Sequence, residues 1–113
     1  MVSTIVQGEA ERLSGELSIL AEPHRLLVLR QLRRGPCSAG ALARAIGVPA
    51  SLASHHLSAL VRAGLVTRRR SGHYVCYAVD HDGLQEVYRH LGRMTGLIGA
   101  AAAEAARTAD QPC

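Results

Sequence analysis

Three cysteines and six histidines give this 113-residue sequence its widest range of possible side-chain chemistry. Cys37, Cys76 and Cys113 are 39 and 37 positions apart, which matches neither a disulfide framework nor a zinc motif. An odd count without a secretion leader indicates reduced thiols, so Cys37 and Cys113 are candidates for a redox switch. The motifs of hydrolases, metalloproteases and nucleotide-binding enzymes do not occur, and we expect no enzymatic activity.

A second group combines carboxylates and imidazoles towards the C-terminal end. Asp82, Glu86 and His90 recur every four positions, which places them on one stripe of a helix, and His81 precedes them. Oxygen and imidazole ligands suit nickel or zinc, so these four residues are candidate ligands for a divalent metal ion. The alternative is that the acids favour the positive end of a helix dipole and that His90 is a surface residue.

Arginine is distributed unevenly along the chain. Residues 23–79 contain nine arginines and neither Asp nor Glu, although the net charge of the whole chain is only +4. A carboxylate-free stretch of this length is typical of a surface that meets a polyanion such as nucleic acid. A basic surface in contact only with solvent is the alternative.

The elements that position these residues follow from apolar spacing and from cap residues. Thr4 to Gln7 fits a capping box, and Leu13 and Leu17 continue a first helix at helical spacing. Pro23 suits the first turn of a second helix, which Gly35 and Pro36 end. The inward-facing residues of this second helix are expected to be Leu26, Leu27, Leu29 and Leu32.

The next segments predict a helix-turn-helix arrangement. Ser38 can cap a short third helix that ends at Gly47, and Pro49 opens a fourth helix that ends near Gly64. Only Gly47, Val48 and Pro49 separate the two helices, and such a tight turn is typical of this motif. On the fourth helix Ala53, Leu57 and Leu60 are expected to face the core.

The remaining elements are a hairpin and a last helix. Residues 65–69 and 73–79 are predicted strands around a turn at Arg70-Ser71-Gly72, and Asp80 or Asp82 can cap the helix that follows. Apolar residues of that helix recur at spacings of 3, 4, 3 and 4, as in a coiled-coil seam. With two residues of the first helix they form the predicted dimer interface: Leu13, Leu17, Leu84, Val87, Leu91, Met94 and Ile98.

The whole pattern predicts a mainly α fold with a small β-hairpin, in the order helix, helix, helix, helix, strand, strand, helix. We expect one winged helix-turn-helix domain over residues 1–107 and a flexible tail over 108–113. The sequence contains neither an apolar run long enough to cross a bilayer nor a leader, so a cytoplasmic protein without membrane contact is expected.

Several stretches resemble the ArsR/SmtB family of metal- and metalloid-responsive repressors. They are residues 20–29 (LAEPHRLLVL), residues 51–60 (SLASHHLSAL), and Gly64-Leu65-Val66 with residues 70–77 (RSGHYVCY), and the resemblance extends over about residues 9–98. It implies a homodimeric transcriptional regulator that binds a palindromic operator in double-stranded DNA. In that family an inducer, usually a metal ion, lowers DNA affinity.

Within this fold the candidate DNA contacts lie on the fourth helix and in the hairpin. Short hydroxyls allow a helix to sit deep in the major groove, histidine can reach purine acceptors, and arginines contact phosphates. The candidates are Ser51, Leu52, Ser54, His55, His56, Ser58 and Arg62 on the helix and Arg68, Arg70 and His73 in the hairpin. For His56, a position at the edge of the core is an equal alternative.

At the positions where family members carry the residues that bind their inducing ion, this sequence has other residues. Cys37 is followed by Ser38 and Ala39 rather than by a second cysteine at the third helix. The offsets used by zinc-, nickel- and cobalt-binding members hold His81, Gly83, Met94 and Leu97, and the cysteine positions in the recognition helix hold Ala59 and Ala63. The leading hypothesis is a regulator that responds to nickel, zinc or another divalent or soft ion through a non-standard site. A thiol-based redox regulator and a winged-helix protein-interaction module are the alternatives.

Overall fold

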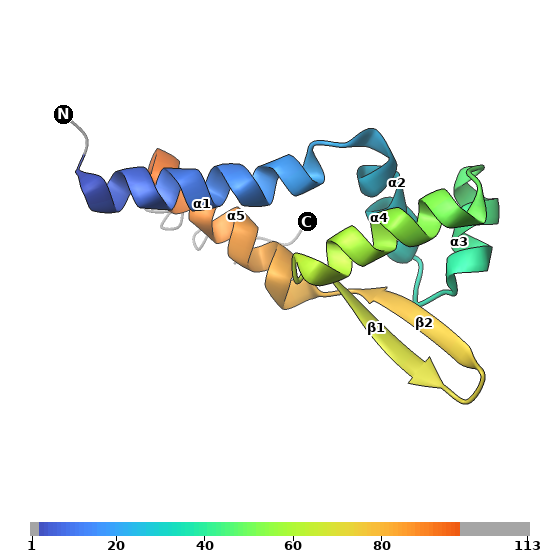
Figure 1. Ribbon diagram of the computed structural model, residues 1–113. Coiled ribbons are helices and arrows are strands. Elements are labelled where there is room, and N and C mark those ends of the chain that lie inside the picture. The colour runs from blue at the N-terminus through green and yellow to red at the C-terminus, as the bar shows by residue number, and fades with distance from the viewer. Residues whose placement is uncertain (1–2, 98–113) are drawn as a thin grey trace, which may run out of the picture.

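Apolar periodicity, capping residues and glycines divide the chain into the predicted sequence of elements. The computed structural model describes residues 3–97. The elements are α1 (Thr4–Leu20), α2 (Pro23–Leu32), α3 (Ala39–Ile46), α4 (Ala50–Arg62), β1 (Val66–Ser71), β2 (Tyr74–Val79) and α5 (His81–Thr95) (Figure 1). None of these helices combines the length and the apolar character that a membrane crossing requires.

Side-chain caps begin four of the helices, α1, α2, α3 and α5, each by satisfying a backbone N–H that has no partner within the helix. Ser3 Oγ accepts from the Val6 N–H at 3.2 Å, so Ser3 rather than the predicted Thr4 caps α1. Ser38 caps α3 as predicted, and Asp80 caps α5 by accepting from the Gly83 N–H at 3.0 Å.

The buried side of α2 differs from the prediction. Leu26 and Leu27 are exposed, whereas Val28 is completely buried and Leu32 nearly so. The segment from Leu26 to Leu29 is an unbroken apolar run, which does not by itself indicate the inward side of a helix. The contacts of α2 with α3 and α4 determine which side of α2 is buried.

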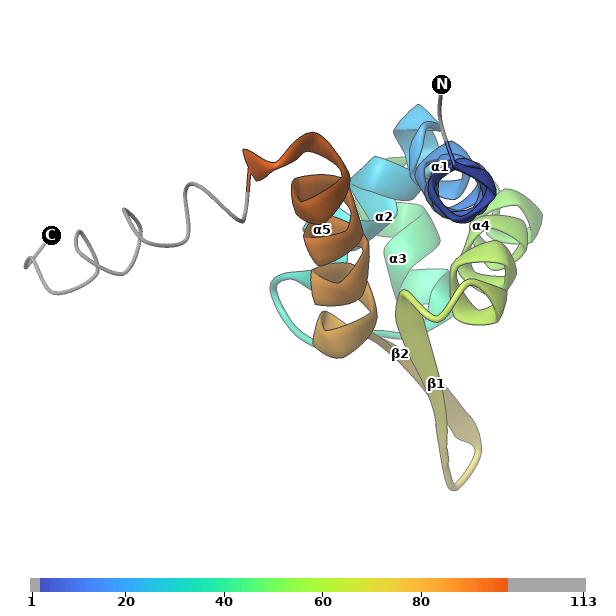
Figure 2. The same cartoon turned by 90° about the vertical axis from the view of Figure 1, so that its left-hand side faces the viewer.

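The core lies where α2, α3 and α4 meet the base of the hairpin. Its most deeply buried side chains are Val28, Leu42, Leu57, Leu60 and Leu65. Helices α1 and α5 pack against each other and extend the core to one side, with Leu13 and Val87 as its buried members there (Figures 1 and 2). Aliphatic residues thus supply the core, as the absence of Phe and Trp requires.

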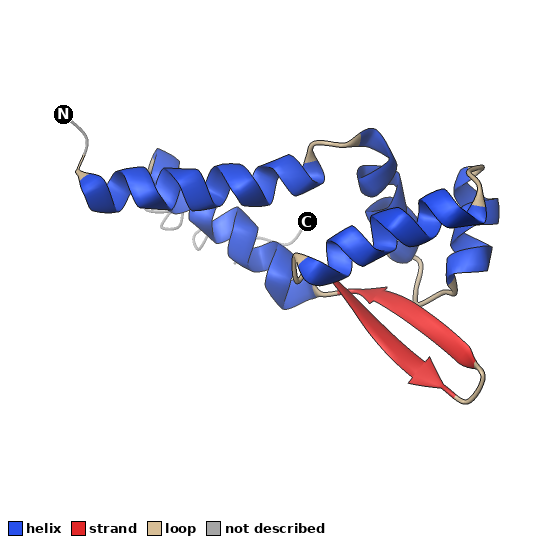
Figure 3. Ribbon diagram, in the orientation of Figure 1, coloured by secondary structure: helices blue, strands red, loops and turns tan. Residues whose placement is uncertain are grey.

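The hairpin projects away from the helices (Figure 3). Its strands pair antiparallel from Val66 opposite Val79 to Ser71 opposite Tyr74, so the turn is Gly72-His73 and not the predicted Arg70-Ser71-Gly72. A two-residue turn favours positive φ, and Gly72 has φ +61°. The base of the hairpin is fixed by two backbone hydrogen bonds between Cys37 and Tyr77, at 3.0 and 2.8 Å.

Helix α5 is shorter than its apolar spacing predicts. It ends at Thr95, where Gly96 adopts the left-handed conformation (φ +76°) that commonly terminates a helix. The predicted seam residue Ile98, the redox candidate Cys113 and the predicted flexible tail 108–113 lie outside the described residues.

A close backbone approach between α5 and the residue that follows α4 leaves no room for a side chain at Gly83. A Cβ atom added at Gly83 would lie 1.8 Å from the carbonyl oxygen of Gly64, whereas at Gly15 in α1 it would meet nothing within 4 Å. We expect Gly83→Ala to lower the free energy of unfolding by about 1–3 kcal/mol, because backbone must move. Gly15→Ala should raise it by about 0.5–1 kcal/mol through helix propensity. Urea unfolding of both variants measures these changes. The prediction would be contradicted if both substitutions changed the free energy of unfolding by the same amount in the same direction.

Candidate nucleic-acid interface

The outward side of α4 carries polar side chains because its other side is fixed in the core. Ala53, Leu57 and Leu60 are completely buried, as predicted. The predicted contact residues Ser51, Ser54, His55, Ser58 and Arg62 are exposed or partly exposed, and Leu52 is half-buried at their margin. This surface combines hydroxyl, imidazole and guanidinium groups, which can hydrogen-bond to base edges and phosphates.

The two helices of the motif are joined by a turn that Gly47 permits. Gly47 has φ +73°, and its N–H and that of Val48 both donate to the Ala43 carbonyl, at 2.9 and 3.0 Å. Pro49 then precedes the first residue of α4 in extended conformation. The turn therefore holds α4 against α3 with its N-terminal end exposed at the surface.

His56 does not belong to this exposed surface, and its prediction as a DNA contact is wrong. It is only 5% exposed. Its ring lies between α2 and α4, where Nδ1 accepts from Arg25 Nε at 3.2 Å and Nε2 lies 3.6 Å from Glu22 Oε2. The adjacent His55 points outward, because neighbouring positions on a helix are about 100° apart.

The hairpin adds a row of arginines to the interface. Arg68, Arg69 and Arg70 are all exposed, as is His73 in the turn. The strand register places Arg68 and Arg70 on the side of Tyr77 and Val75, and Arg69 on the side of Cys76. Cationic side chains therefore project from both sides of the hairpin, a distribution that suits contact with a phosphate backbone.

A group that the sequence does not predict lies behind α4, at the start of α2. Glu22 caps α2 by accepting from the Arg25 N–H at 3.0 Å, and its other oxygen lies 3.3 Å from His24 Nδ1. The Arg25 guanidinium also donates to the Ile19 carbonyl, at 3.2 Å, so it connects the end of α1 to His56 in α4. Glu22 before Pro23 is a recognisable cap signal, but nothing local indicates that His56 lies beside it.

The ionisation of this group reflects burial and hydrogen bonding. Burial lowers the pKa of His56; the Glu22 carboxylate opposes this, while Arg25 and the two neighbouring histidines add to it. Burial works to raise the pKa of Glu22, but the Arg25 backbone N–H and the two histidine rings together hold it below its usual value. The result is a neutral imidazole between a guanidinium and a carboxylate.

Of the four metal ligands predicted on the last helix, only Glu86 and His90 are brought together. His81 and Asp82 lie at the start of α5, and His81 is exposed. Further along the helix, His90 Nε2 lies 2.9 Å from Glu86 Oε1 and His90 Nδ1 lies 3.0 Å from Glu16 Oε2 in α1. Both ring nitrogens of His90 thus face carboxylates on opposite sides of the ring. Within residues 3–97, the group of three such ligands that surrounds a common point is Glu22, His24 and His56 instead.

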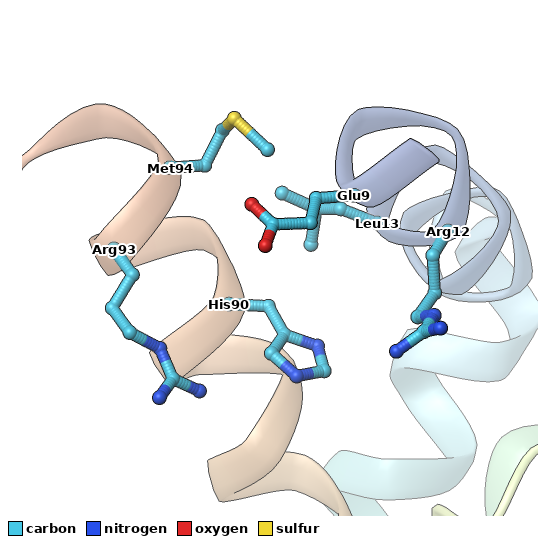
Figure 4. Close-up of a pocket in the computed structure, with 6 residues that line it drawn as sticks. All are labelled: Glu9, Arg12, Leu13, His90, Arg93 and Met94. Atoms are coloured by element: carbon cyan, nitrogen blue, oxygen red, sulfur yellow. The ribbon is translucent and has the colours of Figure 1, made fainter. Parts of the chain in front are cut away.

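A pocket of about 330 Å³ lies between α1 and α5. Figure 4 shows its lining: Glu9, Arg12 and Leu13 from α1 and His90, Arg93 and Met94 from α5. Charges of both signs surround it, so its lining does not select an ion of one charge.

The predicted dimer seam divides into buried and exposed parts. Leu13 and Val87 are buried within the chain, and Leu17, Leu84 and Met94 pack against the same core. For Leu13 and Val87 the prediction of a contact with a partner is wrong, because α1 and α5 already cover each other within one chain. Leu91 remains 39% exposed, beside the exposed Tyr88 one turn earlier.

Cys37 lacks the properties of a redox-active thiol. It is half-buried beside the base of the hairpin. Burial raises the pKa of the Cys37 thiol, with a smaller contribution from Cys76. Reactive cysteines are exposed and have a lowered pKa, so the burial and the raised pKa of Cys37 count against the thiol-switch prediction for this residue.

Known sequences resemble this chain over most of its length. A family model described as a helix-turn-helix domain matches residues 20–69. The nodulation protein NolR of Rhizobium meliloti is 35% identical over 91 residues, which cover 80% of this chain and 72% of NolR.

Solved structures agree with this relationship. The crystal structure of NolR from Sinorhizobium fredii matches with a TM-score of 0.70 and 34% identity, over 85% of this chain and 96% of NolR. The solution structure of a homodimeric winged helix-turn-helix DNA-binding domain from Mycobacterium bovis, described as a possible ArsR-family regulator, matches with a TM-score of 0.64 and 27% identity. That match covers 89% of this chain and 90% of the other. Together with the α4 surface and the basic hairpin, these similarities establish that the chain belongs to the ArsR/SmtB family of winged helix-turn-helix, DNA-binding transcriptional regulators.

Proposed function

We propose that this chain acts as a homodimer that binds a palindromic operator through two copies of α4 and two hairpins. The observation that carries the proposal is the polar outward side of α4 beside an arginine-bearing hairpin, within a segment that has no carboxylate. In the major groove Ser51, Ser54, His55 and Ser58 would contact base edges and phosphates, with Leu52 against a thymine methyl. Arg62, Arg68, Arg70 and His73 would contact the flanking backbone.

Dimerisation is proposed to use the exposed apolar residues of α5. Tyr88 and Leu91 are three positions apart and therefore lie on one side of the helix, next to the stripe that packs into the core. The M. bovis structure that this chain resembles is a homodimer. A second copy would cover this side of α5 and fix the distance between the two recognition helices.

The proposed effector is a divalent metal ion, nickel, zinc or an ion of similar chemistry. The predicted set on α5 is not our choice of site, because His81 and Asp82 lie in the first turn of that helix and His90 lies well beyond them. Support comes from the compact group of two imidazoles and one carboxylate behind α4.

The dependence of DNA binding on salt tests the proposed interface. Removal of one phosphate contact should reduce the slope of log K against log salt by about 1. We therefore expect Arg68→Gln with Arg70→Gln to flatten the slope by about 2 in each chain and to leave the fold intact. Fluorescence anisotropy with a labelled duplex measures it.

Arg89→Gln is the matched control, because Arg89 is an exposed arginine on α5 that pairs with Glu86 at 2.9 Å. Its slope should equal that of the wild type. A flat slope for the wild type would instead favour the protein-interaction module.

A further inference from the structure

Glu22, His24 and His56 present their ligand atoms to one point between the start of α2 and the recognition helix. All three atoms lie within 4.8 Å of one another. Glu22 Oε1 is 3.3 Å from His24 Nδ1, and Glu22 Oε2 is 3.6 Å from His56 Nε2. Ligand atoms bound at about 2.1 Å around a tetrahedral zinc ion lie about 3.4 Å apart. These two separations involve different oxygens of Glu22, so binding through a single oxygen requires a side-chain adjustment that brings all three ligand atoms around the ion.

The chemistry of the three groups suits a borderline ion. Two imidazoles and one carboxylate are a ligand set for zinc, nickel or cobalt, and three protein ligands leave a position for water. Glu22 can supply one oxygen while the other continues to cap α2. The His24 side chain is 42% exposed, so an ion has a path from solvent to the buried His56.

A metal ion at this point would change the hydrogen bonding of His56. In the neutral ring Nδ1 accepts from Arg25, so the proton is on Nε2. A metal ion on Nε2 requires that proton to move to Nδ1, which keeps the ring neutral but turns Nδ1 into a donor. A guanidinium has no acceptor and cannot pair with it. Metal binding and the hydrogen bond between Arg25 and His56 therefore exclude each other.

Breaking the hydrogen bond between Arg25 and His56 would affect both helices that the Arg25 side chain connects. Arg25 holds the Ile19 carbonyl at the end of α1 as well as His56 in α4. Its release removes a link between the helix that carries the DNA contacts and the helix that packs against α5.

We propose that Glu22, His24 and His56 bind one zinc, nickel or cobalt ion, and that binding releases Arg25 and weakens the hold on α4. The proposal rests on the proposed function, because α4 is the helix through which operator affinity would change. Operator binding then falls by a factor in the usual range of allosteric coupling, about 5–150.

Titration with Co²⁺, followed by its visible absorption, tests the site directly. The wild type should bind one Co²⁺ per chain at this site, and His24→Gln should weaken binding at least about tenfold. His24 is half-exposed near the start of a helix, so this variant should fold normally. His81→Gln is the matched control, since His81 is an exposed histidine in the first turn of α5, and it should bind as the wild type does.

Two further measurements separate the parts of the proposal. Nitrogen chemical shifts of the His56 ring should place the metal on Nε2 and a proton on Nδ1. Zn²⁺ should weaken binding of a DNA duplex by the wild type and leave that of His24→Gln unchanged.

The proposed site would be overturned if His24→Gln bound Co²⁺ as tightly as the wild type. It would also be overturned if His81→Gln lost as much Co²⁺ affinity as His24→Gln. Co²⁺ binding with unchanged DNA affinity would overturn its coupling to α4. Salt-dependent DNA binding without any metal would persist in either case, so failure of the metal site is distinguishable from failure of the proposed function.

Discussion

Leu91→Glu is expected to convert the protein into a monomer and to lower operator affinity by about 10²–10⁴-fold. Leu91 lies with Tyr88 on the exposed apolar side of α5, where a second copy would bury it. A carboxylate buried there without a partner costs several kcal/mol. Two linked recognition helices gain a factor of about 10²–10⁴ over one, and the monomer does not have that gain. Analytical ultracentrifugation and anisotropy with operator DNA measure the two effects.

The control for this variant is Arg89→Glu, an acidic substitution at an exposed position of the same helix. The Arg89→Glu protein should sediment as the wild type does. A dimeric Leu91→Glu protein would show that a different surface holds the two copies together.

Leu57→Ala is expected to produce a large fall in stability. Leu57 is completely buried beneath the polar, outward side of α4. Such a truncation removes apolar contacts and leaves a cavity, which costs about 2–5 kcal/mol. Since a domain of this size is stable by only about 5–15 kcal/mol, the unfolding midpoint in urea should fall markedly.

Ser58→Ala is its matched comparison at the next position of α4, where the side chain is exposed. Stability should change by less than about 0.5 kcal/mol, because the hydroxyl makes no buried contact. DNA affinity should fall instead. If both variants were destabilised equally, the assignment of the two sides of α4 would be wrong.

The elements with strong local signals are predictable from sequence. Gly47 with Pro49 defines the turn between α3 and α4, and Ser38 defines the start of α3, because glycine conformations and side-chain caps act over three or four residues. The buried stripe of α4 follows from the spacing of Ala53, Leu57 and Leu60. These signals also locate the outward-facing serines and His55, so most of the proposed nucleic-acid interface can be located before the fold is known.

Features that depend on contacts between distant segments are not predictable in this way. His55 and His56 are adjacent, and only the packing of α4 on α2 decides that His56 is buried beside Arg25. The apolar spacing of α5 is the same for an intramolecular core as for a dimer seam, and packing on α1 assigns Val87 to the core. The Glu22, His24 and His56 group joins residues from two distant parts of the chain, for which no short motif exists.

Selection of bound duplexes from a random DNA pool tests the central claim most directly, because the operator sequence does not have to be known beforehand. A homodimer that places two copies of α4 in successive major grooves should enrich an inverted repeat. The centres of its half-sites should be about 10–10.5 base pairs, or a multiple of that, apart. Arg68→Gln with Arg70→Gln should reduce binding without changing the enriched bases at the half-site centres. Enrichment of a single unrepeated half-site, or of no sequence at all, would contradict binding by a homodimer through α4 and the hairpin.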